Sequence, residues 1–343
     1  MEKLPKISIV TCTYNGERVI SEFLSKIFSQ DYPKNNMEII LADGGSTDKT
    51  LEIIEKFRKK YPKIIKFIHN PKQYSIGKGN GMDIATKKAS GEIIVQLDQD
   101  NILIQKSWLR RMIEILVKNK NISAVQSRYY TPEGSSATDK YVNSLGIEDP
   151  FASNYSLNAQ IALNPKKFKY NESQGFFVYE VNKNNFYYAG DNGFAIRRKD
   201  FIESGGYTQD IDNFYRMALS KKKYKIAVPK DILLHHKTTT SFLHMIKKRS
   251  YYAGHYLLKN YGDRNFYWFS LKNNSFKQNS KFVLTVVFNL LFVPGLIQGI
   301  KMSLRTRNTF WFIHPFALFF ITLSYVKTFF YSKFFKKQKE ASI

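Results

Sequence analysis

The chain has 343 residues, with 53 Lys and Arg against 28 Asp and Glu, which gives a formal net charge of +25. Its hydrophobic content of 43% and charged content of 24% are those of a folded protein and exclude an intrinsically disordered chain. The basic excess favours contact with nucleic acid, an anionic membrane surface or phosphorylated substrates, and charge alone does not choose among them. The single cysteine, Cys12, excludes an internal disulfide framework. The first six residues lack the apolar run of a signal peptide, so we expect folding in the cytosol.

Short apolar runs alternate with helical periodicity over the first 127 residues. Strands are predicted at residues 7–12, 38–42, 64–68, 93–97 and 123–126. Helices are predicted at residues 17–29, 48–60, 78–88 and 106–118. In the second helix, Ser46 or Thr47 is expected to cap the start. Alternation at this spacing predicts an α/β fold with a mostly parallel sheet and helices on both faces. Residues 129–188 show weak periodicity, and a regular pattern resumes near Gly190.

The character of the chain changes after residue 240. Residues 241–260 read as a basic amphipathic helix suited to a membrane interface, and two long apolar segments follow at 282–300 and 309–331. Three interpretations of these segments stay open: a spanning hairpin, a shallow re-entrant hairpin, and two buried helices of a soluble domain. Basic residues flank both segments, so they indicate orientation weakly. The predicted domains are residues 1–240, 241–280 and 281–343.

Polar clusters follow three of the predicted strands, at residues 13–16, 43–46 and 98–101. In parallel sheets, ligands bind beyond the carboxyl ends of the strands, so these clusters predict one site. Asp98 and Asp100 are separated by one residue, and both carboxylates can point at a hard cation such as Mg²⁺ or Mn²⁺. An acidic turn is the alternative, and Asp43 on another strand end favours the metal site.

The chain resembles family 2 glycosyltransferases of the GT-A fold, which is Rossmann-like. The resemblance is carried by IVTCTYNGERVI, LADGGSTDKT and GKGNGMDIATKKASGEIIVQLDQDN, whose order and spacing agree over roughly the first 130 residues. A second stretch, GDNGFAIRRKDFIESGGYTQDID, resembles the later half of the same domain.

The resemblance implies a donor site for a nucleotide-diphosphate sugar. The implied donor residues are Thr11, Tyr14, Asn15, Asp43, Lys78 and Asp98. Among them, Asp43 corresponds to the acid that recognises the base, and Lys78 faces the diphosphate or is a solvated lysine at a helix start. The resemblance makes Asp100 the principal metal ligand.

The same resemblance assigns the catalytic base and an acceptor region. Gln209-Asp210 stands where the family usually has Glu-Asp, so Asp210 is the candidate base, with Asp212 as its rival. Either histidine of the pair His235-His236 can complete the metal site, and we take His236 as the candidate. The implied acceptor-region residues are Asp191, Asn192 and Arg198. Arg197 or Arg198 could hold a lipid phosphate, or both could be surface arginines.

These observations predict inverting, metal-dependent transfer of one sugar from a nucleotide-diphosphate sugar, with UDP favoured. The acceptor is expected to be a lipid-linked or membrane-proximal glycan, with bare polyprenyl phosphate as the alternative. Processive relatives carry a Gln-x-x-Arg-Trp motif, and the stretch here, Lys247 to Tyr251, lacks it. We expect a cell-membrane location with the catalytic domain on the cytoplasmic side. An inactive membrane scaffold and a nucleic-acid binder are the alternatives from other classes.

Overall fold

The computed structural model describes residues 3–70, 78–145, 149–154, 170–173, 175–182, 190, 192–207, 212–237, 241–254 and 269–340. The chain divides into two compact units. The first, here called the sheet unit, contains residues 1–130 and 159–237, and the second, the helical unit, contains residues 131–158 and 238–343. Residues 131–158 therefore group with the C-terminal segments, although the sequence analysis places them in a domain that ends at 240. The predicted domain limits stay a prediction.

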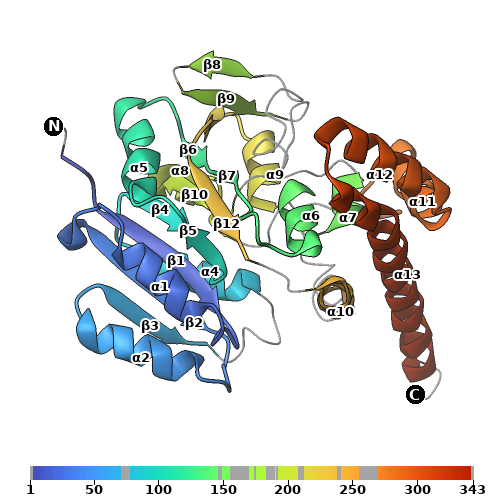
Figure 1. Cartoon of the computed structure of the whole chain (residues 1–343), viewed down its shortest axis with the longest axis horizontal. Helices are drawn as coiled ribbons and strands as arrows, with labels where there is room; N and C mark the ends of the chain where they lie inside the picture. Colours follow the sequence, from blue (N-terminus) through green and yellow to red (C-terminus); the bar gives the residue numbers. More distant parts are fainter. Residues whose placement is uncertain are drawn as a thin grey trace. The chain divides into compact units, whose positions relative to one another are not determined.

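The sheet unit is built on a nine-stranded sheet in the order β3-β2-β1-β4-β10-β6-β11-β9-β8 (Figure 1). The strands are β1 (Ile7–Thr13), β2 (Met37–Asp43), β3 (Ile65–His69), β4 (Ile93–Gln96), β6 (Ala124–Gln126), β8 (Asn171–Ser173), β9 (Phe176–Val181), β10 (Phe194–Arg197) and β11 (Tyr224–Pro229). The first four are parallel to one another, and β10 runs antiparallel between β4 and β6. This arrangement confirms the predicted α/β class.

A second, three-stranded sheet has the order β5-β12-β7. Its strands are β5 (Asn101–Leu103), β12 (Leu233–His236) and β7 (Arg128–Tyr129). The antiparallel pairing of β12 with β5 sets His236 opposite Asn101. This register brings the end of the predicted histidine pair to the predicted acidic turn.

Helices cover both faces of the large sheet, as the sequence predicts. The helices are α1 (Ile20–Phe28), α2 (Thr50–Lys60), α4 (Lys78–Lys87), α5 (Trp108–Lys118), α8 (Arg198–Glu203) and α9 (Asp212–Leu219). One apolar core joins α1, α2 and α5 to the sheet, and another joins α4, α8 and α9 to its other face. Every residue of β1 and β2 is buried, which explains why both strands are mostly apolar without a strict alternation of apolar and polar residues.

The start of α2 differs from its predicted capping. The backbone N–H of Thr50 donates to Asp48 at 3.0 Å, whereas the hydroxyl of Ser46 donates to Asp43. Neither Ser46 nor Thr47 caps this helix, because Asp48 is nearer to its first turn and satisfies one of its free N–H groups.

Regular elements also occur in the middle of the chain, where the sequence predicts little. They include β8, β9, α6 (Ala137–Leu145) and α7 (Pro150–Asn154). The apolar residues of α6 are few, but Tyr141 and Val142 are almost fully buried. Their burial against other helices, rather than local periodicity, selects the helix here.

The carboxylate of Glu38 lies buried beside β1 and β3. It accepts hydrogen bonds from Ser8 and Ser90 and pairs with Lys66 at 2.6 Å. Burial alone would raise the pKa of Glu38, but Lys66 and the two serines outweigh it and lower the pKa to about 2.

Glu38→Gln is expected to lower the free energy of unfolding by about 1–2 kcal/mol at neutral pH, because Lys66 loses its buried partner. The wild-type advantage is present above the ordinary pKa of 4.5 and is lost as pH falls towards 2, because the folded state must then bind the proton. Urea unfolding followed by tryptophan fluorescence measures both effects. Glu52→Gln, at the exposed pair with Lys56, is the control and should change little. Equal losses in both variants would contradict the assignment.

The helical unit consists of α6, α7 and the C-terminal helices. The latter are α10 (Phe242–Tyr252), α11 (Phe276–Leu290), α12 (Val293–Thr306), the 3-10 helix η5 (Thr309–Phe312) and α13 (Ile313–Glu340). Among the described residues, Thr309–Phe330 is long and apolar enough to cross a membrane, with a mean hydropathy of 1.5. Helices α11 and α12 pass the same test together but are bent by 79° at their break.

A chain of polar side chains runs through the helical unit. The hydrogen-bonded pairs are Tyr141–His314 (2.8 Å), His314–Gln298 (3.0 Å), Gln298–Asn154 (3.2 Å), Asn154–Asn289 (2.6 Å) and Asn289–Thr322 (3.1 Å). Beside it, Asp149 accepts from Arg249 and from the hydroxyl of Tyr325. The hydrogen-bonded chain from Tyr141 to Thr322 links five helices, so α6 and α7 are integral to the bundle.

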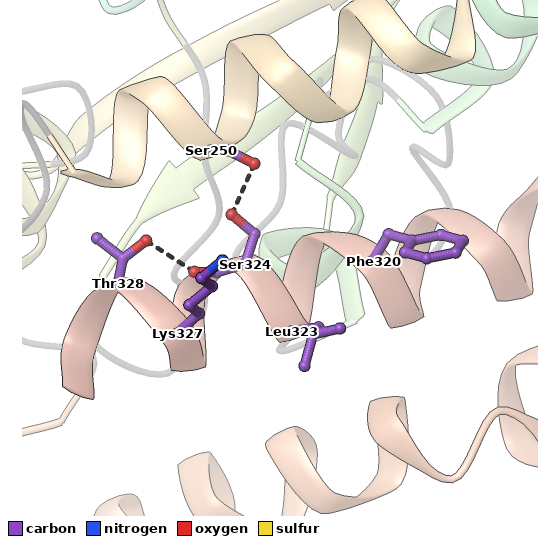
Figure 2. Close-up of a pocket in the computed structure, with 6 residues that line it drawn as sticks. All are labelled: Ser250, Phe320, Leu323, Ser324, Lys327 and Thr328. Carbon is purple, nitrogen blue, oxygen red and sulfur yellow. Dashed lines mark hydrogen bonds between the residues drawn. The ribbon is translucent and has the colours of Figure 1, made fainter. Parts of the chain in front are cut away.

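A groove of about 420 Å³ lies between α10 and α13 in this unit (Figure 2). Its lining residues are Ser250, Phe320, Leu323, Ser324, Lys327 and Thr328. The hydroxyl of Ser324 donates to Ser250 at 2.6 Å. The groove therefore combines polar groups with apolar side chains.

Candidate active site

The candidate site lies at the carboxyl ends of β1, β2 and β4. Since these strands are parallel and adjacent, the loops that follow them meet at one edge of the sheet. The three polar clusters of the sequence are these loops, and the structure joins them by hydrogen bonds between side chains and backbone.

Asp98, Asp100 and His236 form a cluster at this edge. One ligand atom from each residue lies within 4.8 Å of the others, and His236 Nε2 is 3.3 Å from Asp100 Oδ1. Two carboxylates and an imidazole are a donor set that suits Mn²⁺ or Mg²⁺ with open positions for other ligands. Successive side chains of a strand point to opposite faces, so His235 does not share the position of His236 and is buried. The role of Asp98, Asp100 and His236 as metal ligands stays a prediction.

Asn101 shapes the acidic turn. Its side-chain oxygen accepts from the backbone N–H of Asp98 at 3.0 Å, and its backbone N–H donates to the carbonyl of Asp98 at 2.9 Å. The amide nitrogen reaches Asn192 at 2.9 Å and lies 3.4 Å from Asp100. Because Asn101 is fully buried, this ring of contacts fixes where the two carboxylates project.

Gln99 links the acidic turn to the loop after β1. Its amide donates to the carbonyl of Tyr14 at 3.1 Å and accepts from the N–H of Tyr14 at 3.3 Å. A Cβ on Gly16 would lie 2.3 Å from the Gln99 side chain. Glycine at position 16 therefore permits this close approach.

The loops after β1 and β2 are tied together in the same way. Ser46 accepts from the N–H of Asn15 at 2.9 Å, and Asn15 in turn accepts from the N–H of Thr47 at 2.9 Å. Asn15 has a φ of 44°, a conformation that asparagine tolerates better than most residues. Thr50 accepts from the N–H of Gly16 at 2.7 Å. The two loops therefore hold each other in one preorganised arrangement.

Asp43 lies at the centre of these two linked loops and is fully buried. One carboxylate oxygen accepts from the N–H groups of Gly45 and Ser46, both at 2.9 Å, and the other accepts from the hydroxyls of Ser46 and Thr13. The geometry gives Asp43 a role in holding its own loop. Recognition of a nucleotide base by this carboxylate stays a prediction.

The other residues implied to bind the donor differ in their exposure to solvent. Tyr14 is 37% exposed at the site edge. Thr11 is fully buried within β1, and its hydroxyl has no hydrogen-bond partner among the described residues. Lys78 begins α4, and its side chain lies outside the described part of the structure.

Asn192 belongs to the site, and it is held there by Gln126. The Gln126 amide donates to the carbonyl of Asn192 at 2.7 Å and accepts from the N–H of Gly190 at 2.7 Å. Gly193 has a φ of +73°, and a Cβ there would lie 2.2 Å from the Ser127 hydroxyl. This turn consequently requires glycine.

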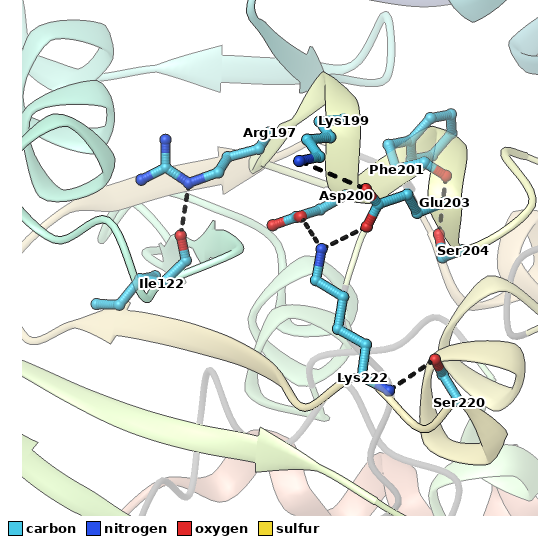
Figure 3. A network of polar contacts seen from close by, with 9 residues as sticks. All are labelled: Ile122, Arg197, Lys199, Asp200, Phe201, Glu203, Ser204, Ser220 and Lys222. Atoms are coloured by element: carbon cyan, nitrogen blue, oxygen red, sulfur yellow. Dashed lines mark hydrogen bonds and ion pairs between the residues drawn. The ribbon is translucent and has the colours of Figure 1, made fainter.

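Arg197 and Arg198 lie away from the candidate site, at the amino-terminal end of β4. Strand β10 runs antiparallel to β4, which sets Arg197 opposite Ile93 at the start of that strand. The Arg197 guanidinium donates to the carbonyls of Leu116, Asn119 and Ile122, the last at 2.9 Å (Figure 3). The predicted place of Arg198 in an acceptor region beside Asn192 is not what the structure shows, because the sequence does not reveal the direction of β10.

The surroundings of this arginine pair are structural. Lys222 donates to Asp200 at 2.6 Å and also pairs with Glu203, which ties α8 to the turn before β11 (Figure 3). Burial would lower the pKa of Lys222, but the two carboxylates outweigh it and raise the pKa. This network fastens the helix that follows β10.

Two further implied site residues, Asp210 and Asp191, lie outside the described residues, as does the side chain of Asp212. Conversely, the sequence analysis assigned no role to Gln99, Asn101 or Gln126. Gln99 and Asn101 stand within the polar cluster that the sequence does reveal, so their position is the signal that could have found them. Gln126 ends a buried apolar strand, where an amide needs a partner.

Comparison with known proteins decides the family. Residues 8–205 match the sequence profile of glycosyl transferase family 2. The chain belongs to this family. The match confirms the resemblance carried by the sequence motifs, and it covers much of the sheet unit together with residues 131–158 of the helical unit.

Individual relatives match to different extents. An uncharacterised glycosyltransferase of Haemophilus influenzae is 38% identical over 127 residues, which cover 37% of this chain and 38% of that protein. A dolichyl N-acetyl-α-D-glucosaminyl phosphate 3-β-D-2,3-diacetamido-2,3-dideoxy-β-D-glucuronosyltransferase of Methanococcus voltae is 25% identical, and the alignment covers 91% of this chain and 92% of that protein. The mannosyltransferase PcManGT of Pyrobaculum calidifontis, solved with GDP-Man and Mn²⁺, shares the fold, with a TM-score of 0.56 and 16% identity over 95% of this chain and 88% of that chain.

His236→Gln is expected to weaken Mn²⁺ binding at least about tenfold, because it removes one of three converging ligands. Titration of the purified protein with Mn²⁺, followed by electron paramagnetic resonance, measures the affinity. His235→Gln is the matched control, since the adjacent side chain points away from the cluster, and its affinity should stay within about twofold of wild type. A larger effect of His235→Gln than of His236→Gln would contradict the assignment.

Proposed function

We propose that this protein transfers a single sugar from a nucleotide-diphosphate sugar, with a UDP-sugar favoured, to a lipid-linked or membrane-proximal glycan. The observation that carries the proposal is the convergence of Asp98, Asp100 and His236 with the tied loops after β1 and β2. This edge would provide a cation site beside the two tied loops, which is what a donor with a nucleoside and a diphosphate requires.

The proposed donor site uses the described loops. The loop after β1, with Tyr14 and Asn15, and the loop around Asp43 would hold the nucleoside. Asp98, Asp100 and His236 would hold a divalent cation, either Mn²⁺ or Mg²⁺. When bound, the cation supplies positive charge beside the diphosphate and stabilises it as a leaving group. Gln99 and Asn101 contribute by fixing the direction of the two carboxylates.

The proposed chemistry is one displacement. Asp210 takes the proton of the acceptor hydroxyl while the hydroxyl oxygen attacks the anomeric carbon. The bond between that carbon and the diphosphate oxygen breaks, and the nucleoside diphosphate leaves with the electron pair. Attack opposite the leaving group inverts the anomeric configuration. Tied loops around the donor favour such a positioned reaction over hydrolysis by water.

The Methanococcus voltae relative supports a lipid-linked acceptor, because its name specifies a dolichyl N-acetyl-α-D-glucosaminyl phosphate and its alignment covers 91% of this chain. A role in cell-envelope polysaccharide synthesis fits such an acceptor. The alternative acceptor is bare polyprenyl phosphate. Radiolabelled product formed from polyprenyl phosphate alone would favour that alternative and reject the glycan acceptor.

We further propose attachment to the cell membrane, with the sheet unit on the cytoplasmic side. Large apolar side chains are exposed on α11, α12 and α13, as expected of a lipid-facing surface rather than a soluble one. Among them are Phe276, Leu284, Ile297, Leu304 and Phe330, each at least 60% exposed. Flanking basic residues suit an anionic leaflet and account for part of the net charge of +25 without nucleic acid.

Asp210→Asn is expected to lower sugar transfer by about 10²–10⁴-fold while leaving donor affinity within about twofold, because a base acts on the acceptor. Purified protein is assayed with Mn²⁺ and with UDP-, GDP- and dTDP-sugars, and donor binding is measured by calorimetry. Asp212→Asn is the matched control and should retain most turnover. Equal loss of donor binding and turnover in Asp210→Asn would reject its role as base. Failure of every donor to react with metal present would favour an inactive scaffold.

Ile297→Glu is expected to reduce co-sedimentation of the protein with anionic vesicles at least about tenfold, because a carboxylate replaces an apolar group facing lipid. Ile202→Glu is the matched control, since Ile202 is 56% exposed and Ile297 60% exposed, and Ile202 lies on α8 of the sheet unit. Unchanged binding of Ile297→Glu, or equal losses in both variants, would contradict the proposed membrane surface.

A further inference from the structure

The exposed apolar helices can cross a bilayer or enter it from one side, and contacts within the helical unit distinguish the two. We propose that the helical unit inserts into a single leaflet, so that neither the bent pair α11–α12 nor α13 crosses the membrane. This inference rests on the proposed membrane attachment and specifies which lipid surface the helices fit.

The turn between α12 and α13 packs against α6. In that turn Trp311 packs edge-on against Tyr141 of α6, with ring centroids 5.7 Å apart, and His314 at the start of α13 is hydrogen-bonded to Tyr141 at 2.8 Å. The turn is therefore at the same depth as α6. If α11 and α12 spanned the bilayer, α6 would have to lie at its far side.

The chain connection to α6 is too short for that. Seven residues, and hence eight Cα–Cα steps, separate Tyr129, the last residue of β7, from Ala137, the first of α6. Fully extended, they reach at most about 28 Å, less than a hydrocarbon core of about 30 Å. The connecting sequence, Tyr-Thr-Pro-Glu-Gly-Ser-Ser, is polar and non-helical, and such backbone does not cross lipid. The turn must then lie on the side from which the chain enters, and α11–α12 must turn back within the near leaflet.

The break between α11 and α12 has the form of such a turn. Phe292 adopts a φ of 59°, and the two helices meet at 79°. Exposed basic residues stand at both outer ends of the pair, and the segment between them is largely apolar. They are Lys272, Lys277 and Lys281 near the start of α11, and Lys301, Arg305 and Arg307 at the end of α12. Both ends therefore suit the headgroups of one leaflet.

The contacts of α13 are also unlike those of a spanning helix. The apolar window Thr309–Phe330 begins in η5 and continues along α13. In a spanning helix, Ser324 and Tyr325 would lie about 8 Å beyond the midplane. Ser324 is hydrogen-bonded to Ser250, and Tyr325 to Arg249 at 2.9 Å, both on α10. The neighbouring Lys247 and Lys248 of α10 are exposed, and exposed charged side chains are disfavoured within the hydrocarbon core.

Helix α10 is also tethered, because four residues, and hence five Cα–Cα steps, separate Phe242 from Lys237, the last residue of the sheet unit. They reach about 18 Å at most. Because Lys247 and Lys248 are exposed on it, α10 fits headgroup depth better than the hydrocarbon core, and α13, which is hydrogen-bonded to α10, lies beside it along the interface instead of crossing. The groove in Figure 2, with hydroxyls, Lys327 and apolar side chains at mid-helix, is suited to the same depth.

Single cysteines in a Cys12→Ser background test the inference. Lys59→Cys reports the sheet unit, Lys272→Cys the start of α11, Arg305→Cys the end of α12, and Lys333→Cys the chain beyond the apolar window of α13. Full-length protein is expressed, and sealed inverted and right-side-out membrane vesicles are labelled with a membrane-impermeant maleimide. All four cysteines are expected to label in the same vesicle preparation. Detergent-opened vesicles control for the reactivity of each cysteine.

Two failures are distinguishable. Labelling of Arg305→Cys or Lys333→Cys in the opposite preparation from Lys59→Cys would overturn the one-leaflet insertion and leave membrane attachment standing. Recovery of the protein in the soluble fraction, without vesicles, would overturn membrane attachment and this inference with it. Transfer activity is not a readout in either case.

Discussion

The buried amide of Asn101 is the contact on which the geometry of the site depends. It closes the acidic turn on Asp98, lies beside Asp100 and reaches Asn192, while its strand pairing sets His236 opposite. One side chain therefore positions the acidic turn, Asn192 and His236, which come from three distant parts of the chain. An amide suits this position because it donates and accepts at once and carries no charge that would compete with a cation. The carboxylates are held by a neutral partner and keep their charge available for a ligand.

Much of the sheet unit could be predicted from the sequence, since its central strands are buried on both faces. The ends of β1, β2 and β4 fall within one residue of prediction, because a continuous apolar run ends where polar loop residues begin. The acidic pair Asp98 and Asp100 could be found in the sequence because it directly follows such an apolar run. What local pattern does not encode is pairing direction. The antiparallel course of β10 sends Arg198 to the far edge of the sheet, and the register of β12 on β5 selects between two adjacent histidines.

The helical unit was harder to predict because its sequence signals conflict. Its outer residues read as a membrane segment, whereas Asn289, Gln298 and His314 interrupt the apolar pattern. The structure reconciles the two, since these polar groups face inward and pair with one another and with Asn154. Contacts to α6 and α7, more than 100 residues earlier in the chain, could not be read from periodicity at all.

The chain of six polar residues also bears on how such a sequence can change over time. Each inner member contacts two others, so replacing one by an apolar residue removes a hydrogen bond from each of its two neighbours. Apolar residues on the outer surface face no such requirement, and any side chain of similar hydrophobicity fits there. Relatives that keep this bundle should therefore vary freely on its surface but change Asn154, Asn289 and Gln298 together. Such joint variation would mark the bundle in sequences where the helices themselves are no longer recognisable.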